Sequence, residues 1–266
     1  GTTWTQRIVA MLVIKSSDPF PVQDLSPWPA FRIPPAGEML ELAKSQTHRR
    51  FFKSHVPYDS MPIYEGVKVV HVARDGRDAA MSFYNHKTHY TDEIIDAVTE
   101  NCLKDPKFGT PYLRTEPDPA LHFHDWVTGE ADHIGDPNCG FWYMENSYWA
   151  ARDEPDVLLV HYADLKSDLD GEMRRIADFL SIEIEEDLWP ELVDAATFDS
   201  MKSKADELMP SASEIWQGGG QTFLHRGTNG RWRDVFREGD LAHYDEKVKE
   251  EFSPELAHWI EFGRLG

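Results

Sequence analysis

Gly1-Thr2-Thr3-Trp4 opens the chain and leads directly into an apolar run, Ile8 to Ile14. The run has helical character, and the N-terminus of a helix offers unpaired backbone N–H groups and the positive end of a dipole. Small residues at that point let an anion approach the backbone closely. The stretch therefore predicts half of a phosphate-binding loop at the start of a helix over Thr2 to Ile14. We expect the other half of the loop to lie upstream of Gly1.

Three further stretches rich in β-branched or aromatic residues are predicted to be strands: Arg50 to His55, Val67 to Ala73 and Val157 to Tyr162. Helical patterns separate them, which favours a parallel sheet covered by helices on both faces. Ligands of such folds bind beyond the carboxyl ends of the strands. Lys53, His55 and Arg74 fall at these ends and are the first candidates for a site.

The predicted fold class is therefore α/β, with a central parallel sheet flanked by helices on both faces and a P-loop-like nucleotide site. A length of 266 residues fits one domain over residues 1–266. Further helices are expected at 37–46, 78–85, 92–103, 120–134, 139–151, 171–180, 186–196 and 240–262.

Charge and cysteine content narrow the class of partner. The chain has 27 Lys and Arg against 47 Asp and Glu, a net charge of −20 that repels nucleic acid and anionic membranes. Cys102 and Cys139 lie far apart without metal-ligand spacing, which favours a reducing, cytoplasmic location. No run approaches the roughly 18 apolar residues that span a bilayer. An anionic small ligand needs several of the scarce cations to converge in one cleft.

Four separated motifs together resemble those of the cytosolic-type sulfotransferases, which use 3′-phosphoadenosine 5′-phosphosulfate as sulfuryl donor. Gly1-Thr2-Thr3-Trp4 is similar to the end of the family's 5′-phosphosulfate loop, and Lys53-Ser54-His55 to its Lys-Thr-His segment. The stretch from Val72-Ala73-Arg74 to Ser82 is similar to the 3′-phosphate segment. Arg226-Gly227-Thr228-Asn229-Gly230-Arg231-Trp232 is similar to the C-terminal Arg-Lys-Gly-x-x-Gly-Asp-Trp segment.

The resemblance implies a role for each motif. His55 is expected to be the general base, because an imidazole can accept a hydroxyl proton near neutral pH, and Lys53 to act beside it on the transferred group. Adenine recognition is implied for Trp4, Tyr162, Thr197 and Phe198. The expected nucleotide-binding residues are Gly1, Thr2, Thr3, Trp4, Arg74, Ser82, Tyr162, Thr197, Phe198, Arg226 and Gly227.

Two departures from the family pattern concern the 3′-phosphate. His225 stands where arginine is usual, and a neutral imidazole supplies less charge than a guanidinium. Arg231 replaces the family's acid and could compensate. Outside the motifs, Arg77 is interpreted as a solvated turn residue and Asp164 as a helix cap.

A sulfuryl group carries fewer negative charges than a terminal phosphoryl group, so we expect transfer without a metal. The histidine pairs 86/89 and 122/124 lack the companions of a metal site. A P-loop small-molecule kinase is one alternative, although threonines and not lysine follow the glycine. The other is a catalytically inactive nucleotide- or lipid-binding relative.

The acceptor is expected to be a small-molecule hydroxyl compound, apolar, aromatic or lipid-like. We expect its pocket to be lined by segments 18–35 and 85–109. Aromatic residues occur in these segments and in the helix just before residue 85: Phe20, Trp28, Phe31, Phe83, Tyr84 and Tyr90. The sequence leaves the identity of the acceptor and the oligomeric state open.

Overall fold

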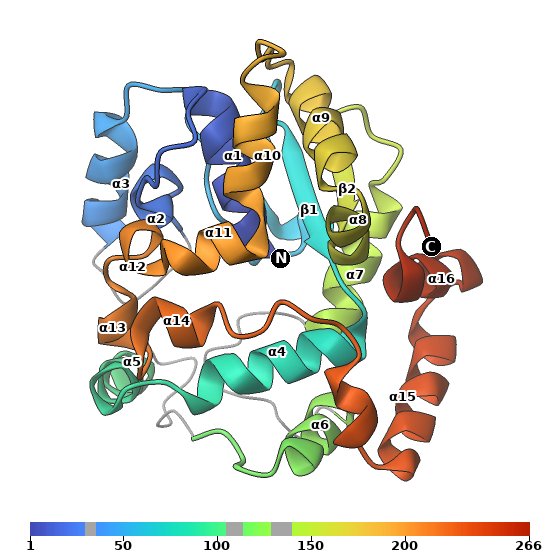
Figure 1. Ribbon diagram of the computed structural model, residues 1–266. Helices are drawn as coiled ribbons and strands as arrows, with labels where there is room; N and C mark the ends of the chain where they lie inside the picture. The colour runs from blue at the N-terminus through green and yellow to red at the C-terminus, as the bar shows by residue number, and fades with distance from the viewer. Residues whose placement is uncertain (30–35, 105–113, 129–139) are drawn as a thin grey trace.

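The computed structural model describes residues 1–29, 36–104, 114–128 and 140–266 (Figure 1). The elements of the first half are α1 (Thr2–Ile14), α2 (Val22–Leu25), α3 (Ala36–Ser45), η1 (Tyr58–Ser60), β1 (Val69–Ala73), α4 (Gly76–Thr88), α5 (Asp92–Lys104), α6 (Pro119–Thr128) and α7 (Gly140–Ala150). Those of the second half are β2 (Val157–His161), α8 (Tyr162–Ser167), α9 (Leu169–Leu180), α10 (Trp189–Ala196), α11 (Phe198–Ser203), α12 (Ala205–Leu208), α13 (Ala212–Ile215), α14 (Gly219–Phe223), η2 (Arg231–Asp234), α15 (Glu238–Glu251) and α16 (Pro254–Phe262).

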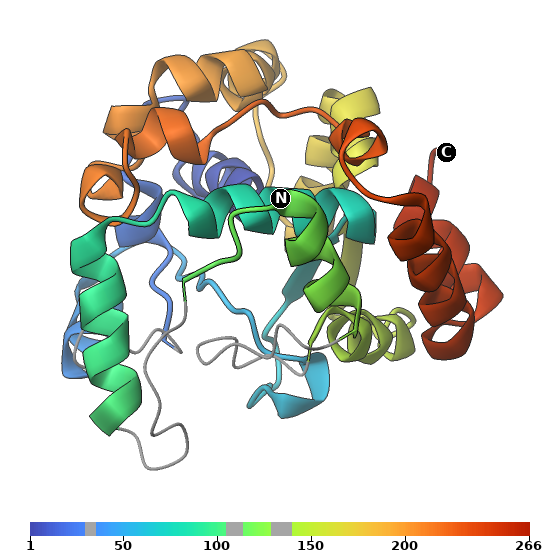
Figure 2. The same ribbon diagram turned by 90° about the horizontal axis from the view of Figure 1, so that it is seen from below.

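The sheet consists, among the described residues, of β1 and β2 paired in parallel. Val69 lies opposite Val157, and the register continues to Ala73 opposite His161. The strands lie at the centre of the molecule with helices on either side (Figure 1 and, seen from below, Figure 2). The predicted α/β class with a parallel sheet is confirmed.

Alternate residues of the two strands enter different apolar clusters, as the two-residue period of a strand requires. Val72 and Val160 pack toward α1, α9 and α10. Ala73 and Leu159 pack toward α7 and α16. The sheet is therefore covered by helices on both faces, which explains why its strands are almost continuously apolar.

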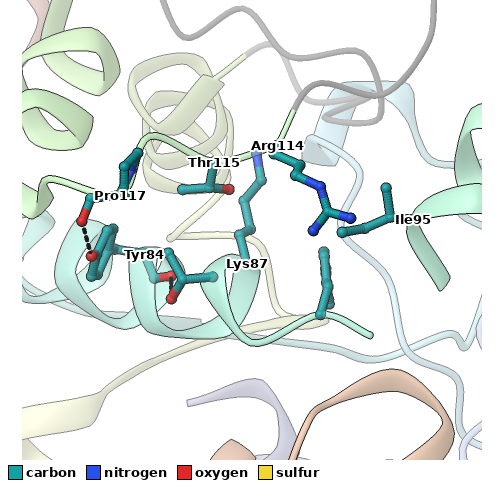
Figure 3. Close-up of a pocket in the computed structure, with 8 residues that line it drawn as sticks. Tyr84, Lys87, Ile95, Arg114, Thr115 and Pro117 are labelled. Carbon is teal, nitrogen blue, oxygen red and sulfur yellow. Dashed lines mark hydrogen bonds between the residues drawn. The ribbon is translucent and has the colours of Figure 1, made fainter. Parts of the chain in front are cut away.

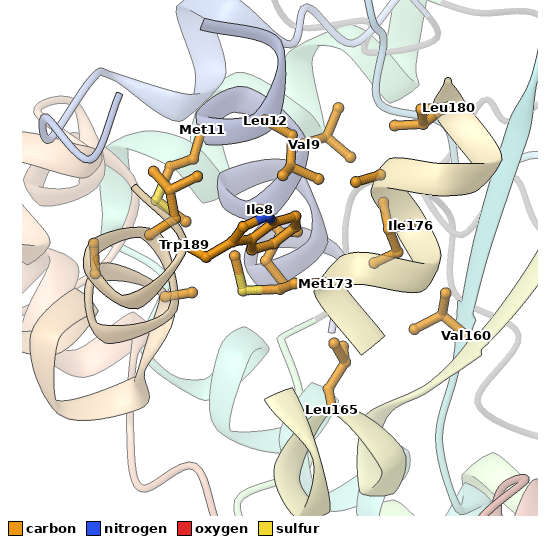
Figure 4. Packing of buried hydrophobic residues seen from close by; sticks show 14 residues of the cluster. Ile8, Val9, Met11, Leu12, Val160, Leu165, Met173, Ile176, Leu180 and Trp189 are labelled. Atoms are coloured by element: carbon orange, nitrogen blue, oxygen red, sulfur yellow. The ribbon is translucent and has the colours of Figure 1, made fainter. Parts of the chain in front are cut away.

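The larger cluster lies between α1, α9 and α10 (Figure 4). In α9 the buried residues Met173, Ile176, Ala177 and Leu180 recur at the spacing of one helix face. Ile8 and Leu12 of α1 meet them and are fully buried. This packing fixes α1 against the sheet and with it the position of the helix N-terminus.

The strand predicted over Arg50 to His55 is wrong, since this segment has no strand pairing in the structure. Strand propensity reflects a fit to a pleated neighbour rather than an intrinsic backbone preference, and the described part of the chain provides no neighbouring strand here. The segment is held by other contacts. The backbone N–H of Lys53 donates to the carbonyl of Pro27 at 2.9 Å, and Phe51 packs against the larger cluster.

Several helix boundaries also differ from expectation: α4 ends at Thr88, and α10 begins at Trp189. α4 begins at Gly76, before the predicted start at Asp78, because the side chain of Asp75 accepts hydrogen bonds from the first turn. The predicted helix 240–262 is two helices. Ser253 caps α16 and Pro254 occupies its first turn, where the missing N–H of proline costs nothing.

Within the described part of the chain, no helix combines the length and apolar character that crossing a bilayer requires. Cys102 is buried, and Cys139 lies outside the described residues. The cytoplasmic location stays a prediction.

Ile176→Ala should lower the free energy of unfolding by about 2–5 kcal/mol, because it leaves a cavity in the cluster between α1, α9 and α10. Denaturant unfolding followed by circular dichroism measures this change. Leu40→Ala is the matched control, since 54% of Leu40 is exposed and its truncation removes little packing. Equal losses for the two variants would contradict the assigned core.

Candidate functional site

The carboxyl edge of the sheet and the start of α1 meet in one place. Gly1 approaches β1 so closely that a Cβ there would lie 2.7 Å from Cγ2 of Val72. Since Ala73 pairs with His161, the next residues, Arg74 and Tyr162, are also neighbours. The Arg74 guanidinium lies over the Tyr162 ring, 4.2 Å from its centroid. The parallel register thus brings a cation to the end of the helix that offers free N–H groups.

Arg74 also contacts a turn that lies far along the chain. Its Nη2 donates to the carbonyl of Thr228 at 3.0 Å and to Oδ1 of Asn229 at 2.8 Å. Asp78 holds the same turn from α4, accepting from the N–H of Gly230 at 2.8 Å. The structure therefore brings together Arg74 and the 226–232 segment, two of the predicted site segments. The sequence analysis did not identify Asp78 as part of the site.

Gly227 adopts a φ of 62°, in the left-handed region that glycine favours. A Cβ at this position would lie 2.5 Å from the ring of Phe198. The Gly227 carbonyl accepts from Nζ of Lys166 at 2.6 Å. Phe198 begins α11, whose N-terminus is capped by the side chain of Thr197. Two more predicted site residues, Thr197 and Phe198, therefore lie beside the turn.

Arg74, Arg226 and Arg231 form what we call the arginine cluster. The pKa of Arg231 is lowered by burial and by the charges of Arg74 and Arg226. Arg231 Nη1 lies 3.2 Å from Nδ1 of His225. The Nε atoms of Arg74 and Arg231 are buried and have no hydrogen-bond partner among the described residues. Mutually repelling cations with unused donors fit an anion with several acceptor oxygens.

The four remaining nucleotide candidates, Trp4, Ser82, Thr2 and Thr3, lie on α1 and α4. The Trp4 indole donates to the carbonyl of Ala196 at 2.7 Å and meets the Tyr162 ring edge-on at 5.4 Å. Ser82 is exposed on α4, one helical turn after Asp78 and on the same helix face. Thr2 and Thr3 form the half-buried first turn of α1. The structure gives Ser82 no direct contact with Arg74.

Lys53 and His55 both pack against Trp28. Nζ of Lys53 lies 4.4 Å from the indole centroid, and the His55 ring meets the indole edge-on at 5.0 Å. Burial lowers the pKa of Lys53 to about 8. Burial, followed by the charge of Lys53, lowers the pKa of His55 to about 3. His55 is therefore a neutral imidazole with a free electron pair at neutral pH.

A second imidazole, His86, lies among aromatic rings next to these two residues. Its centroid is 5.2 Å from Tyr90, 4.9 Å from Trp216 and 5.6 Å from Phe223. Burial and the charges of Lys53 and Lys87 lower its pKa to about 3. Phe83, His86 and Tyr90 have the spacing of residues on one helix face, and this spacing could have indicated the cluster from sequence. Phe31, another predicted acceptor contact, lies outside the described residues.

A separate cavity of about 200 Å³ opens on another face of α4 (Figure 3). Tyr84, Lys87 and Thr88 line it from α4, and Arg114 and Thr115 line it from the segment before α6. Tyr90 contributes to this cavity and to the cluster around His86. The cavity and the ring cluster around His86 therefore share the Tyr90 side chain.

The interpretations of Arg77 and Asp164 are wrong in detail. Arg77 is largely buried, paired with Asp75 and Glu261 and stacked 4.4 Å from the Trp232 ring centroid. Asp164 does not cap α8, which is capped by the side chain of His161. Its carboxylate instead accepts from the backbone N–H groups of Arg264 and Leu265, at 2.8 and 3.0 Å.

Over residues 1–29, 36–104, 114–128 and 140–266, no three His, Cys, Asp or Glu side chains converge as metal ligands. Transfer without a metal stays a prediction.

His55 and His86 should stay neutral in the ligand-free protein down to pH values well below their ordinary pKa of 6.5, with midpoints near 3. Between an ordinary midpoint of 6.5 and a folded-state midpoint near 3, these two histidines are protonated in the unfolded chain but not in the folded chain. The free energy of unfolding should therefore fall as the pH falls through this window. NMR of labelled histidines measures the midpoints, and the denatured protein is the control. A midpoint near 6.5 for folded His55 would contradict the assigned burial.

Comparison with known proteins gives a consistent result. The sulfotransferase domain family matches residues 1–254. A glycolipid sulfotransferase of Mycobacterium bovis is 32% identical over 286 residues, covering 100% of this chain and 86% of the relative. Sulfotransferase 1A1 of Rattus norvegicus is 23% identical, covering 92% of this chain and 78% of its own length.

Solved structures show the same fold. Retinol dehydratase in complex with retinol and PAP has a TM-score of 0.71 at 21% identity, covering 96% of this chain and 78% of that one. Mouse sulfotransferase SULT7A1 complexed with PAP has a TM-score of 0.66 at 16% identity, with 98% and 83% covered. Because the family match spans nearly the whole described chain, the predicted enzyme class is confirmed, and this chain belongs to the sulfotransferase family.

Proposed function

We propose that this protein transfers a sulfuryl group from 3′-phosphoadenosine 5′-phosphosulfate to an acceptor hydroxyl, with His55 as general base. The observation that carries the proposal is the arginine cluster beside the N-terminus of α1 and the end of β1. An acidic protein that gathers cations at one sheet edge is suited to a polyanion. Burial lowers the pKa of His55, which lies close enough to Lys53 and to the start of α1 for both charges to lower this pKa further, so a neutral imidazole lies near the same helix N-terminus.

Two anion sites with aromatic rings beside them suit a doubly phosphorylated adenosine. The backbone N–H groups of Thr2 and Thr3 would bind the 5′-phosphosulfate. Arg74, Ser82, Arg226 and the Gly227 turn would bind the 3′-phosphate, together with Arg231. The solved relatives named above were crystallised with PAP, the nucleotide that remains after transfer, which supports this donor.

The ribose would lie between these phosphate sites, and adenine, attached at C1′, would lie against aromatic faces. Trp4 and Tyr162 meet edge-on, and Phe198 packs against Gly227. An adenine ring stacks readily on such surfaces. Thr197, at the cap of α11, supplies a hydroxyl nearby.

The transfer itself forms one bond and breaks another. The acceptor oxygen attacks sulfur, His55 takes the hydroxyl proton, and the bond from sulfur to the bridging phosphate oxygen breaks as PAP leaves. Lys53 and the donors at the start of α1 stabilise the charge that develops on the leaving and sulfuryl oxygens. The Trp28 indole contacts both Lys53 and His55 and so holds the two side chains near each other.

The acceptor proposed is a lipid-like or glycolipid alcohol. The mycobacterial relative is named a glycolipid sulfotransferase, and one solved relative contains retinol. In this chain Trp28 contacts His55, and the rings of Tyr90, Trp216 and Phe223 contact His86. They offer apolar area for such a molecule, and the two imidazoles offer hydrogen bonds for its polar part.

A P-loop kinase fits this arrangement less well. Its phosphate loop ends in lysine followed by serine or threonine, whereas Gly1 precedes two threonines. ATP also has no 3′-phosphate to occupy the arginine cluster. A catalytically inactive relative would retain nucleotide binding without transfer, which an assay separates directly.

Purified protein should move ³⁵S-sulfate from labelled donor to a hydroxyl in a glycolipid extract, and should not move ³²P from ATP. His55→Ala should lower kcat by about 10²–10⁴-fold, the usual contribution of a general base. PAP affinity, measured by calorimetry, should stay nearly unchanged because His55 does not hold the nucleotide.

His48→Ala is the matched control, since His48 lies seven residues before His55 and its ring packs on Phe51. Normal turnover in His55→Ala would rule out the base assignment. Phosphate transfer without sulfate transfer would favour the kinase.

Arg74→Gln should weaken PAP binding by about 10–100-fold, the value of a lost charged hydrogen bond. Adenosine 5′-monophosphate lacks the 3′-phosphate, so its affinity should change much less. Calorimetric titration of both nucleotides gives the comparison. Arg152→Gln removes the same charge from a partly exposed position on the chain and controls for net charge. Equal losses for both nucleotides would contradict a 3′-phosphate role.

A further inference from the structure

The segment that carries Lys53 and His55 depends on contacts from outside it. Residues 50–56 have no strand pairing in the described structure. On one side, the N–H of Lys53 donates to the carbonyl of Pro27. On the other, the hydroxyl of Tyr148 donates to the carbonyl of Val56 at 2.9 Å. The hydrogen bond from Tyr148 thus fixes the carbonyl of the residue directly after the proposed base.

A second contact from α7 supports the same segment. The N–H of Tyr58 donates to Oγ of Ser147 at 3.0 Å. The rings of Tyr58 and Tyr148 meet edge-on at 5.9 Å. Two consecutive residues of α7 therefore hold the chain within three residues of His55.

Tyr148 is itself held rigidly. It is 5% exposed, and its ring stacks on His71 with centroids 3.8 Å apart and planes 7° from parallel. Nε2 of His71 lies 2.9 Å from Oε2 of Glu145, and both side chains are about nine-tenths buried. Burial and the nearby Glu145 raise the pKa of Tyr148 above its ordinary value, so its hydroxyl keeps the proton that it donates.

His71 belongs to β1 and precedes Arg74 by three residues. The connection therefore runs from the strand that positions Arg74, through His71, Glu145 and Tyr148, to the carbonyl of Val56, the residue after His55. Its two ends are the proposed donor site and the proposed base. A displacement of about 1 Å between such groups can cost 10²-fold in rate.

We infer that Tyr148 is a positioning residue that sets His55 in place relative to the bound donor, with the buried His71 and Glu145 pair fixing Tyr148. This inference rests on the proposed function for its kinetic effect. It concerns the geometry of the base and not the binding of nucleotide.

The test is Tyr148→Phe, which keeps the stacked ring and removes only the hydroxyl. We expect kcat for sulfate transfer to fall about tenfold, close to the value of one lost hydrogen bond. KM for the donor and PAP affinity should stay within about twofold. The NMR signals of the His55 imidazole in ligand-free protein should shift.

Tyr64→Phe is the matched control, since Tyr64 is 72% exposed; it should leave kcat and the His55 signals unchanged. Ser147→Ala, a milder change on the same helix, should also move the His55 signals. An unchanged kcat or an unchanged His55 signal in Tyr148→Phe would overturn the inference, as would reduced stability with kcat intact. Absence of sulfate transfer in the unmodified protein would instead contradict the proposed function, and the His55 signals would still report on the positioning.

Discussion

The parallel register of β1 and β2 is the constraint on which the site depends. Pairing Ala73 with His161 makes Arg74 and Tyr162 neighbours beyond the sheet. Packing of α1 against the same strands brings Gly1 to within van der Waals reach of Val72. A shift of the register would separate the cation from the aromatic face and from the helix N-terminus together. Backbone pairing thus brings the residues of the site together, whatever chemistry their side chains supply.

The like charges of the arginine cluster repel one another, and a bound anion would reduce this repulsion. Arg74 and Arg226 lower the pKa of Arg231, so the three charges destabilise one another in the free protein. Asp78 compensates only in part, lying 3.8 Å from Arg74. The pKa of Asp78 is itself raised, burial being the largest cause. On the proposed function, phosphate binding supplies the missing negative charge, which explains why a protein of net charge −20 keeps these cations together.

Helix bounds that depend on local sequence could be predicted, whereas contacts between residues far apart in the chain could not. The run after Gly1 gave the bounds of α1 because apolar period and helix length agree over 13 residues. The stretch Arg50 to His55 has strand composition but no strand beside it among the described residues, which no local pattern can reveal. The burial of Arg77 depends on the Trp232 ring and on Glu261, which is 184 positions away. The aromatic surroundings of His86 likewise come from Trp216 and Phe223, on segments far along the chain.

The low pKa of His55 has a chemical consequence for a proposed base. An imidazole with a pKa of about 3 is always ready to accept a proton but holds it weakly. Burial and the charge of Lys53 are causes of that weakness. A polyanionic donor bound beside Lys53 would offset the second cause and raise the pKa of His55 toward neutrality. On the proposed function, the donor would thereby strengthen the base that acts on its own sulfuryl group. Base strength would then be coupled to donor binding through charge, while Tyr148 sets the geometry.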